Sequence, residues 1–239
     1  MPRPFDLVLF DADGTLLDFS SSERRAFSNC IQAHVHPDRC EEVYQAFTAV
    51  GTPLWRALEQ GSLSLHELRD RRWTELAQRC GLSYEVAEIS LAYVAELKRH
   101  AHIIDGALEV CRALAESHQL GIVTNGFEEV QVARLAVSRL DAHIDFLVTS
   151  EAAGAHKPAR AIFEHALGCA GRPLAPERVL MVGDNFVSDI LGAQRMGFST
   201  CWFNPEGLPA VQAPRYERGA AVDHEIRTLR QLLPLVADS

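Results

Sequence analysis

Hydrophobic residues change their spacing along the chain. Residues 5–10 (FDLVLF) form a short and almost continuous apolar run, which is typical of a buried strand. From about residue 20 to residue 100, apolar residues recur every three or four positions, for example in RRAFSNCIQAHV (24–35) and YEVAEISLAYVAELKRH (84–100). This spacing predicts helices. We therefore expect an all-helical segment directly after the first strand.

Beyond residue 100, short apolar runs alternate with helical stretches. The predicted strands are 120–126, 146–150, 178–184 and 200–204, and the predicted helices are 105–119, 128–140, 157–171 with Pro158 in its first turn, 188–197 and 224–236. Residues 204–219 carry three prolines and two glycines, which predict an irregular surface loop. Strands separated by helices of this length indicate βαβ units and therefore a parallel sheet.

The predicted fold class is α/β, with a doubly wound, Rossmann-like parallel sheet core and an inserted all-helical cap domain. We assign residues 1–17 and 101–239 to the core and residues 18–100 to the cap. In open α/β sheets, ligands bind in the crevice beyond the carboxyl ends of the strands. The ends of the strands are therefore the places to search for functional residues.

Composition narrows the kinds of partner. The 239 residues are 47% hydrophobic and include 23 Lys+Arg against 32 Asp+Glu, a formal net charge of −9. This charge disfavours a nucleic-acid polymer as partner, and no apolar run is long enough for a membrane span. The six cysteines contain no CxxC pair, so we expect reduced thiols in a cytoplasmic protein, either a monomer or a homodimer. A small charged molecule remains a suitable substrate.

Polar residues that could take part in catalysis or binding follow the ends of the predicted strands. Each group alone has an ordinary interpretation, such as a tight turn or a helix N-cap. Parallel strands bring all of these ends to one edge of the sheet, so together they predict one site. The residues are Asp11, Asp13, Thr124, Asn125, Lys157, Asp184 and Asp189.

The order of these motifs resembles the haloacid dehalogenase (HAD) superfamily of phosphohydrolases with a helical C1 cap. DADGT (11–15), a strand that ends in TN, a lone Lys157 and GDNFVSD (183–189) carry the resemblance. GTPLW, IVTNGF, VLMVGD, SDILGA and TCWFN are similar to the bacterial pyrimidine 5'-nucleotidase branch. That branch tolerates a bulkier residue at the position of Gly14, so the first motif supports the superfamily rather than the branch.

The resemblance implies a role for each polar residue. Asp11 would attack phosphorus and form an aspartyl-phosphate, while Asp13 would act as general acid and then as general base. Lys157 would keep Asp11 oriented and ionised. Thr124 and the backbone N–H of Asn125 would bind the phosphoryl oxygens.

The resemblance also implies a divalent cation, Mg²⁺ or Mn²⁺. Its ligands would be the Asp11 side chain, the Asp13 backbone carbonyl and Asp184, with Asp189 binding it directly or through its water shell. Magnesium prefers oxygen ligands and retains waters, which suits a few carboxylates plus a phosphate.

These roles predict a phosphomonoesterase, and the nucleotidase branch implies pyrimidine nucleoside 5'-monophosphates such as dUMP, UMP or dTMP as substrates. Asp13 argues against a dehalogenase, which lacks a carboxylate there. The alternatives are a phosphatase for phosphoglycolate or a sugar phosphate, a β-phosphoglucomutase-like phosphomutase, and a phosphate-binding scaffold without turnover. Lys98 is interpreted as a solvated helix-end residue, and Phe19 and Trp55 are candidates for contact with the leaving group.

Overall fold

The computed structural model describes residues 4–209 and 222–237. Most of the loop predicted at 204–219 lies outside the described residues, and residues 204–209 are irregular as expected. None of the helices in the described ranges combines the length and apolar composition needed to span a bilayer.

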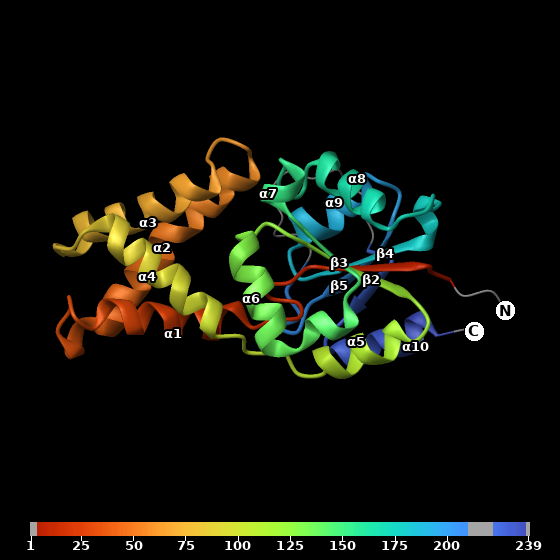
Figure 1. Cartoon of the computed structure of the whole chain (residues 1–239), viewed down its shortest axis with the longest axis horizontal. Helices are drawn as coiled ribbons and strands as arrows, with labels where there is room; N and C mark the ends of the chain where they lie inside the picture. Colours follow the sequence, from red (N-terminus) through yellow and green to blue (C-terminus); the bar gives the residue numbers. More distant parts are fainter. Residues whose placement is uncertain (1–3, 210–221, 238–239) are drawn as a thin grey trace.

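One part of the molecule is built on a sheet, which lies beside the helices α1–α4 in Figure 1. Its six parallel strands have the order β3-β2-β1-β4-β5-β6. The strands are β1 (Leu7–Phe10), β2 (Gln119–Thr124), β3 (Phe146–Thr149), β4 (Val179–Gly183), β5 (Ser199–Phe203) and β6 (His224–Ile226). The accompanying helices are α5 (Ala107–Ala115), α6 (Glu128–Ser138), α7 (Ser150–Ala153), α8 (Arg160–Cys169), α9 (Gly192–Gln194) and α10 (Leu232–Val236).

Both faces of the sheet are covered, as its nearly continuous apolar strands require. Val8 and Phe10 of β1 belong to the apolar cluster that includes α5 and α10. Leu7 and Leu9 alternate to the other face, where α8 and α9 cover them. The α/β fold class predicted from the sequence is confirmed.

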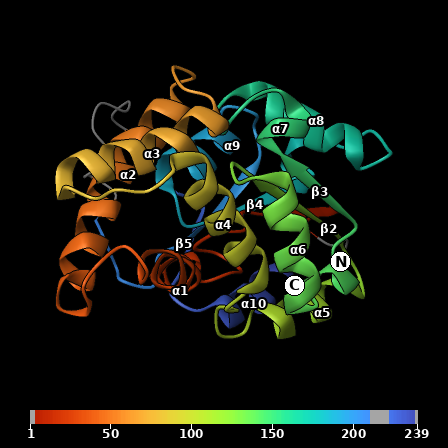
Figure 2. The ribbon, with the colours of Figure 1, turned by 60° about the vertical axis from the view of Figure 1, so that its left-hand side comes forward.

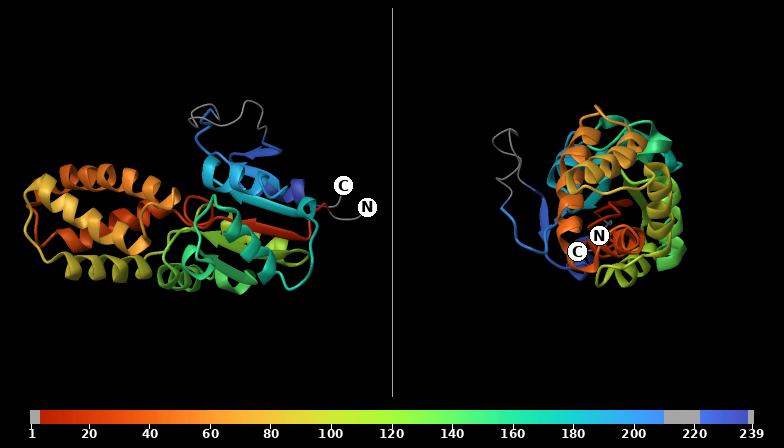
Figure 3. Two further views of the ribbon diagram at one scale, coloured as in Figure 1. Left: turned by 90° about the horizontal axis from the view of Figure 1, so that it is seen from above. Right: turned by 90° about the vertical axis from the view of Figure 1, so that its left-hand side faces the viewer.

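The segment between β1 and α5 is helical, as predicted. It contains α1 (Phe19–Ile31), α2 (Cys40–Glu59), α3 (Leu65–Cys80) and α4 (Val86–Arg99). These helices extend from the end of the sheet at which the strands finish (Figures 1–3). They pack around a cluster that includes Phe27, Phe47, Trp73 and Tyr93. The division of the chain into a core and a cap at residues 17/18 and 100/101 stays a prediction.

Local signals explain where some of these helices begin and end. Ser64 and Glu67 form a reciprocal capping box at the start of α3, and Gly81 ends it in the left-handed conformation. The GTPLW stretch suggests a helix junction near Trp55, but α2 continues through Pro53 to Glu59. Because the apolar face of α2 is buried, its packing outweighs the backbone hydrogen bond that Pro53 cannot donate.

Two predicted helices differ from the structure near the C-terminal half of the sheet. The prediction of one helix over 224–236 is wrong, because His224–Ile226 pairs with β5 as an edge strand and only Leu232–Val236 is α-helical. The helix predicted at 188–197 begins earlier, as a π-helix over Phe186–Leu191. The side chain of Asn185 caps it by accepting from the backbone N–H groups of Val187 and Ser188.

Pro158 does not lie in the first turn of α8, which begins at Arg160. The Asn125 side chain binds both backbone polar groups of Lys157, the residue before Pro158. Its Oδ1 accepts from the Lys157 backbone N–H at 2.7 Å, and its Nδ2 donates to the Lys157 carbonyl at 3.0 Å. These bonds fix the backbone at Lys157 outside the helix.

Candidate active site

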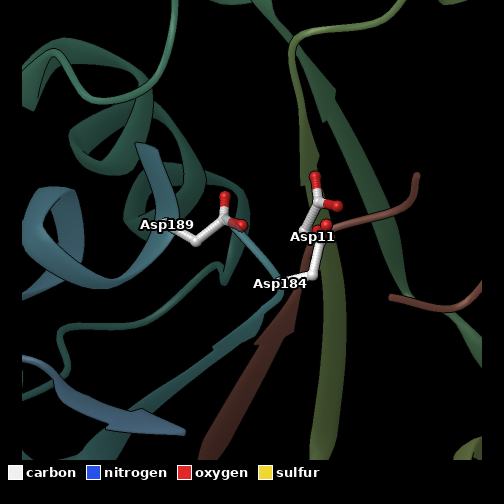
Figure 4. Close-up of side chains that lie close together, drawn as sticks. All are labelled: Asp11, Asp184 and Asp189. Atoms are coloured by element: carbon white, nitrogen blue, oxygen red, sulfur yellow. The ribbon is translucent and has the colours of Figure 1, made fainter. Parts of the chain in front are cut away.

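The strand order brings the acidic motifs together at one edge of the sheet. Asp11 follows β1 and Asp184 follows β4, and these two strands are direct neighbours. Figure 4 shows Asp11, Asp184 and Asp189 converging there. A cavity of about 240 Å³ lies between this edge and the helical segment, lined by Asp11, Asp13, Phe19, Trp55, Glu59, Thr124, Asn125, Gly126, Lys157, Asp184, Asn185 and Ser188. Six of the seven predicted residues therefore line one cavity.

The seventh, Asp189, is fully buried next to Lys157. Asp11, Asp184 and Asp189 each have one carboxylate oxygen that lies within 4.8 Å of the corresponding oxygens of the other two residues. Burial, and next the nearby carboxylate of Asp189, raises the pKa of Asp184 to about 7. Burial also raises the pKa of Asp11 well above its ordinary value, although Lys157 opposes this effect.

Lys157 is the cation inside this acidic group, with only 2% of its side chain exposed. Its Nζ donates to Asp11 Oδ1 at 2.5 Å and to Asp189 Oδ1 at 2.7 Å. Burial by itself would lower the pKa of Lys157, but the two carboxylates raise it above its ordinary value. The lysine is therefore charged, and the three acids together exceed its charge.

This excess of negative charge fits a divalent cation. One ammonium group cannot compensate three carboxylates packed so closely. Burial is the main cause of the raised pKa values of Asp11 and Asp184, and the neighbouring carboxylates raise them further. Carboxylate oxygens are also the donors that magnesium prefers. The side chains of Asp11, Asp184 and Asp189 would hold the ion.

The turn after β1 is built around Gly14 and Thr15. Gly14 has φ +92°, and a Cβ at this position would lie 2.4 Å from Asp184 Oδ2, so both conformation and space require glycine. The buried Thr15 hydroxyl accepts from the Asp184 backbone N–H at 3.1 Å and lies within 3.4 Å of carboxylate oxygens of Asp11 and Asp184. Thr15 thus ties the two strand ends together.

Thr124 ends β2 and is buried beside the cavity, where its hydroxyl accepts from the backbone N–H of Gly126 at 3.1 Å. The resemblance assigns the neighbouring Asn125 a role through its backbone N–H. The structure adds that its side chain binds both backbone groups of Lys157. The loop after β2 therefore positions the lysine of a loop more than thirty residues later.

Asp13 is held by two side chains of α6 that sequence reasoning missed. Gln131 Nε2 donates to Asp13 Oδ2 at 2.5 Å, and Arg134 Nη1 donates to Asp13 Oδ1. Gln131 and Arg134 lie on the same buried stripe of α6 as Val130 and Leu135. Two polar residues at a three-residue spacing on an apolar face were the available signal.

Three side chains of the helical segment form the opposite wall of the cavity. Phe19 and Trp55 are candidates from the sequence, and both line the cavity. Glu59, at the end of α2, was missed because a polar residue at a helix end carries no distinctive pattern. Its Oε1 accepts from Asn185 Nδ2 at 3.3 Å, and burial followed by the charge of Asp189 raises its pKa.

Lys98 does not belong to the set of residues that line this cavity. It stands in the last turn of α4, as expected, but its Nζ is 2.9 Å from Glu129 of α6 and its side chain is 39% exposed. Lys98 is therefore half-buried in an ion pair with α6, rather than a freely solvated residue.

Comparison with known proteins identifies relatives over almost the whole chain. A family model described as haloacid dehalogenase-like hydrolase matches residues 5–197. The chain is 35% identical to the pyrimidine 5'-nucleotidase YjjG of Escherichia coli, over 85% of this chain and 91% of that protein. It is 30% identical to the pyrimidine 5'-nucleotidase PynA of Streptococcus pneumoniae, over 89% and 90%.

Solved structures share the fold. The crystal structure of Bacillus subtilis YfnB bound to magnesium has a TM-score of 0.85 and 28% identity, covering 98% of this chain and 99% of that one. The L-2-haloacid dehalogenase of Xanthobacter autotrophicus has a TM-score of 0.77 at 22% identity, with 97% and 98% covered. The second similarity concerns the fold alone.

Proposed function

This chain belongs to the haloacid dehalogenase-like hydrolases and is a phosphatase of that family, and on this premise we propose that it hydrolyses pyrimidine nucleoside 5'-monophosphates through an aspartyl-phosphate on Asp11. The observation that carries the proposal is the shared cavity. It combines an acid ion-paired with a buried lysine, Asp11 with Lys157, and a second acid, Asp13, two residues away.

In the first step, an Asp11 carboxylate oxygen attacks phosphorus while the bond to the ester oxygen breaks. The ester oxygen takes a proton from Asp13 and leaves as an alcohol. Lys157 orients the attacking carboxylate through its bond to Asp11 Oδ1. Thr124 and the backbone of Asn125 bind the phosphoryl oxygens as their charge redistributes.

In the second step, water attacks the phosphorus of the aspartyl-phosphate. Asp13 accepts a proton from that water, the bond between Asp11 and phosphorus breaks, and inorganic phosphate leaves. The side chains of Asp11, Asp184 and Asp189 would hold a Mg²⁺ ion, which would neutralise part of the charge on the phosphoryl oxygens. Asp11 returns to its ionised form, ready for another turnover.

Two features support a nucleoside as the leaving group. The relatives with 30% and 35% identity are named pyrimidine 5'-nucleotidases. In this chain, Phe19 and Trp55 offer aromatic faces in the cavity, and aromatic side chains stack on bases. Glu59 places an acid on the same wall, which disfavours a leaving group with its own negative charge, such as that of phosphoglycolate.

The nucleophile is tested with Asp11→Asn. With Mg²⁺ and p-nitrophenyl phosphate, we expect the variant to release no phosphate, because an amide cannot form the acyl-phosphate. Acid quenching of the wild-type enzyme during turnover, followed by peptide mass spectrometry, should locate the phosphoryl group on the peptide that contains Asp11. Unchanged turnover of the variant would refute the assignment.

The substrate is tested with a panel of phosphate esters. dUMP, UMP and dTMP should have the highest kcat/KM, with release of free phosphate and no transfer to a second sugar hydroxyl. Glu59→Gln should narrow the gap between nucleotides and phosphoglycolate by roughly tenfold, because it removes one charge from the wall. The matched control is Glu88→Gln, an exposed residue of α4. A wild-type preference for phosphoglycolate would reject the nucleotidase proposal.

A further inference from the structure

Arg134 is a buried cation that uses only part of its hydrogen-bonding capacity, and this argues against a role in packing alone. Its side chain has no exposed surface, and its ion pair is with Asp13. Its Nε and Nη2 have no hydrogen-bond partner in the described part of the chain. A buried charge is costly unless it is paired, so the single carboxylate it meets carries the compensation.

A second buried arginine provides a contrast. Arg72 of α3 pairs with Glu23 at 2.7 Å, donates to the Phe47 carbonyl and lies over the Phe47 ring at 3.6 Å. Glu23 and Phe47 are both buried within the helical segment. Arg134 instead directs its bond at a carboxylate that faces the catalytic cavity.

Gln131 completes the grip on Asp13. One helical turn before Arg134, its Nε2 donates to Asp13 Oδ2 at 2.5 Å and lies 3.4 Å from Thr124 Oγ1. Each oxygen of Asp13 thus has its own donor on α6, while 24% of the side chain is exposed. The Asp13 carboxylate is therefore bound by α6 on one side and exposed to the cavity on the other.

We propose that Arg134 and Gln131 are positioning residues that fix the Asp13 carboxylate for both of its proton transfers. This inference rests on the proposed function, in which Asp13 protonates the leaving ester oxygen and later accepts a proton from water. An aspartate that rotates freely spends little time at the ester oxygen. Two donors that lock both oxygens remove that freedom, and precise orientation is a large source of catalytic rate.

The position of α6 makes these residues suited to the task. α6 packs against α4 of the helical segment and begins shortly after the Thr124 strand end (Figures 1 and 2). The guanidinium of Arg134 lies 5.5 Å from the centre of the Phe19 ring, and Phe19 also lines the cavity. α6 therefore contacts both Asp13, which follows β1, and Phe19, which belongs to the opposite wall of the cavity.

The test is Arg134→Met, which removes the charge and retains most of the volume. With dUMP or another alkyl phosphate, kcat should fall roughly ten- to hundredfold while KM changes little, because phosphate binding uses other residues. The phosphorylation step with p-nitrophenyl phosphate should fall less, because p-nitrophenolate leaves without a proton. Arg134→Lys should recover part of kcat.

A double-mutant cycle separates positioning from general damage. In an Asp13→Ala background, Arg134→Met should cause no further loss in single-turnover phosphorylation by p-nitrophenyl phosphate. The control is Arg178→Met, which removes an arginine bonded to Asp6 at 2.9 Å near the start of β4 and should lower stability without changing kcat. If Arg134→Met does not fold, Gln131→Leu carries the same test without loss of a charge.

The outcomes distinguish this inference from the proposed function. Asp13→Ala with unchanged turnover of dUMP defeats the proposed function itself. Asp13→Ala without turnover, together with Arg134→Met and Gln131→Leu at wild-type kcat, overturns only the positioning role. Equal losses from Arg134→Met with and without Asp13 also overturn it, since the arginine would then act independently of that carboxylate.

Discussion

Removal of divalent cations at controlled pH perturbs the carboxylate cluster directly, and Asp184→Asn isolates the contribution of one carboxylate. Burial and then the neighbouring Asp189 raise the pKa of Asp184 from 3.8 to about 7. A group with a raised pKa in the folded state contributes stability that is present in full below its unfolded pKa. That stability is lost as the pH rises through the folded value.

The magnitude follows from the two pKa values. From 3.8 to about 7 is about three pH units, and at 1.36 kcal/mol per unit this corresponds to about 4 kcal/mol. Between pH 4 and pH 8 in EDTA, the wild-type protein should therefore lose about 4 kcal/mol of unfolding free energy relative to Asp184→Asn. Saturating Mg²⁺ should restore more stability at pH 8 than at pH 5, because the ion binds ionised carboxylates.

The assay is urea denaturation followed by circular dichroism at several pH values, with EDTA or with Mg²⁺. Asp6→Asn is the matched control with the opposite sign. The hydrogen bonds from Arg178 lower the pKa of Asp6, so its contribution is present above its unfolded pKa and is lost as the pH falls. Parallel pH curves for wild type and Asp184→Asn in EDTA would refute the reasoning.

Two further predictions concern the loops of the site. Gly14→Ala should destabilise the protein by about 1 to 3 kcal/mol more than Gly61→Ala, measured by urea denaturation. Both glycines have positive φ, but only at Gly14 does a Cβ collide, with Asp184 Oδ2, whereas nothing lies within 4 Å at Gly61; equal losses would contradict this. Asn125→Ala should lower kcat by about ten- to hundredfold with a small change in KM, measured by steady-state phosphate release, because Lys157 loses both backbone anchors. Wild-type kcat in that variant would exclude the anchoring role.

The alternation of apolar runs and helical stretches along the chain is enough by itself to determine the α/β fold class. Each β-strand in the interior of a parallel sheet must be apolar on both faces, and that requirement is visible locally. The motif residues are visible for a related reason. Asp11, Asp13, Thr124 and Asp184 all stand at or just after the ends of apolar runs, and topology alone brings such positions to one edge.

Only the tertiary structure decided how these groups are held and what surrounds them. The bonds from Gln131 and Arg134 to Asp13 join residues more than 110 positions apart, and Glu59 reaches the cavity from the end of another helix. The strand at 224–226 likewise exists because β5 offers it an edge. Helix spacing reports which face of a segment is buried, but not which partner it meets. Long-range packing therefore determined which side chains surround the motif residues, whereas the local sequence pattern had already shown that these residues follow the strand ends.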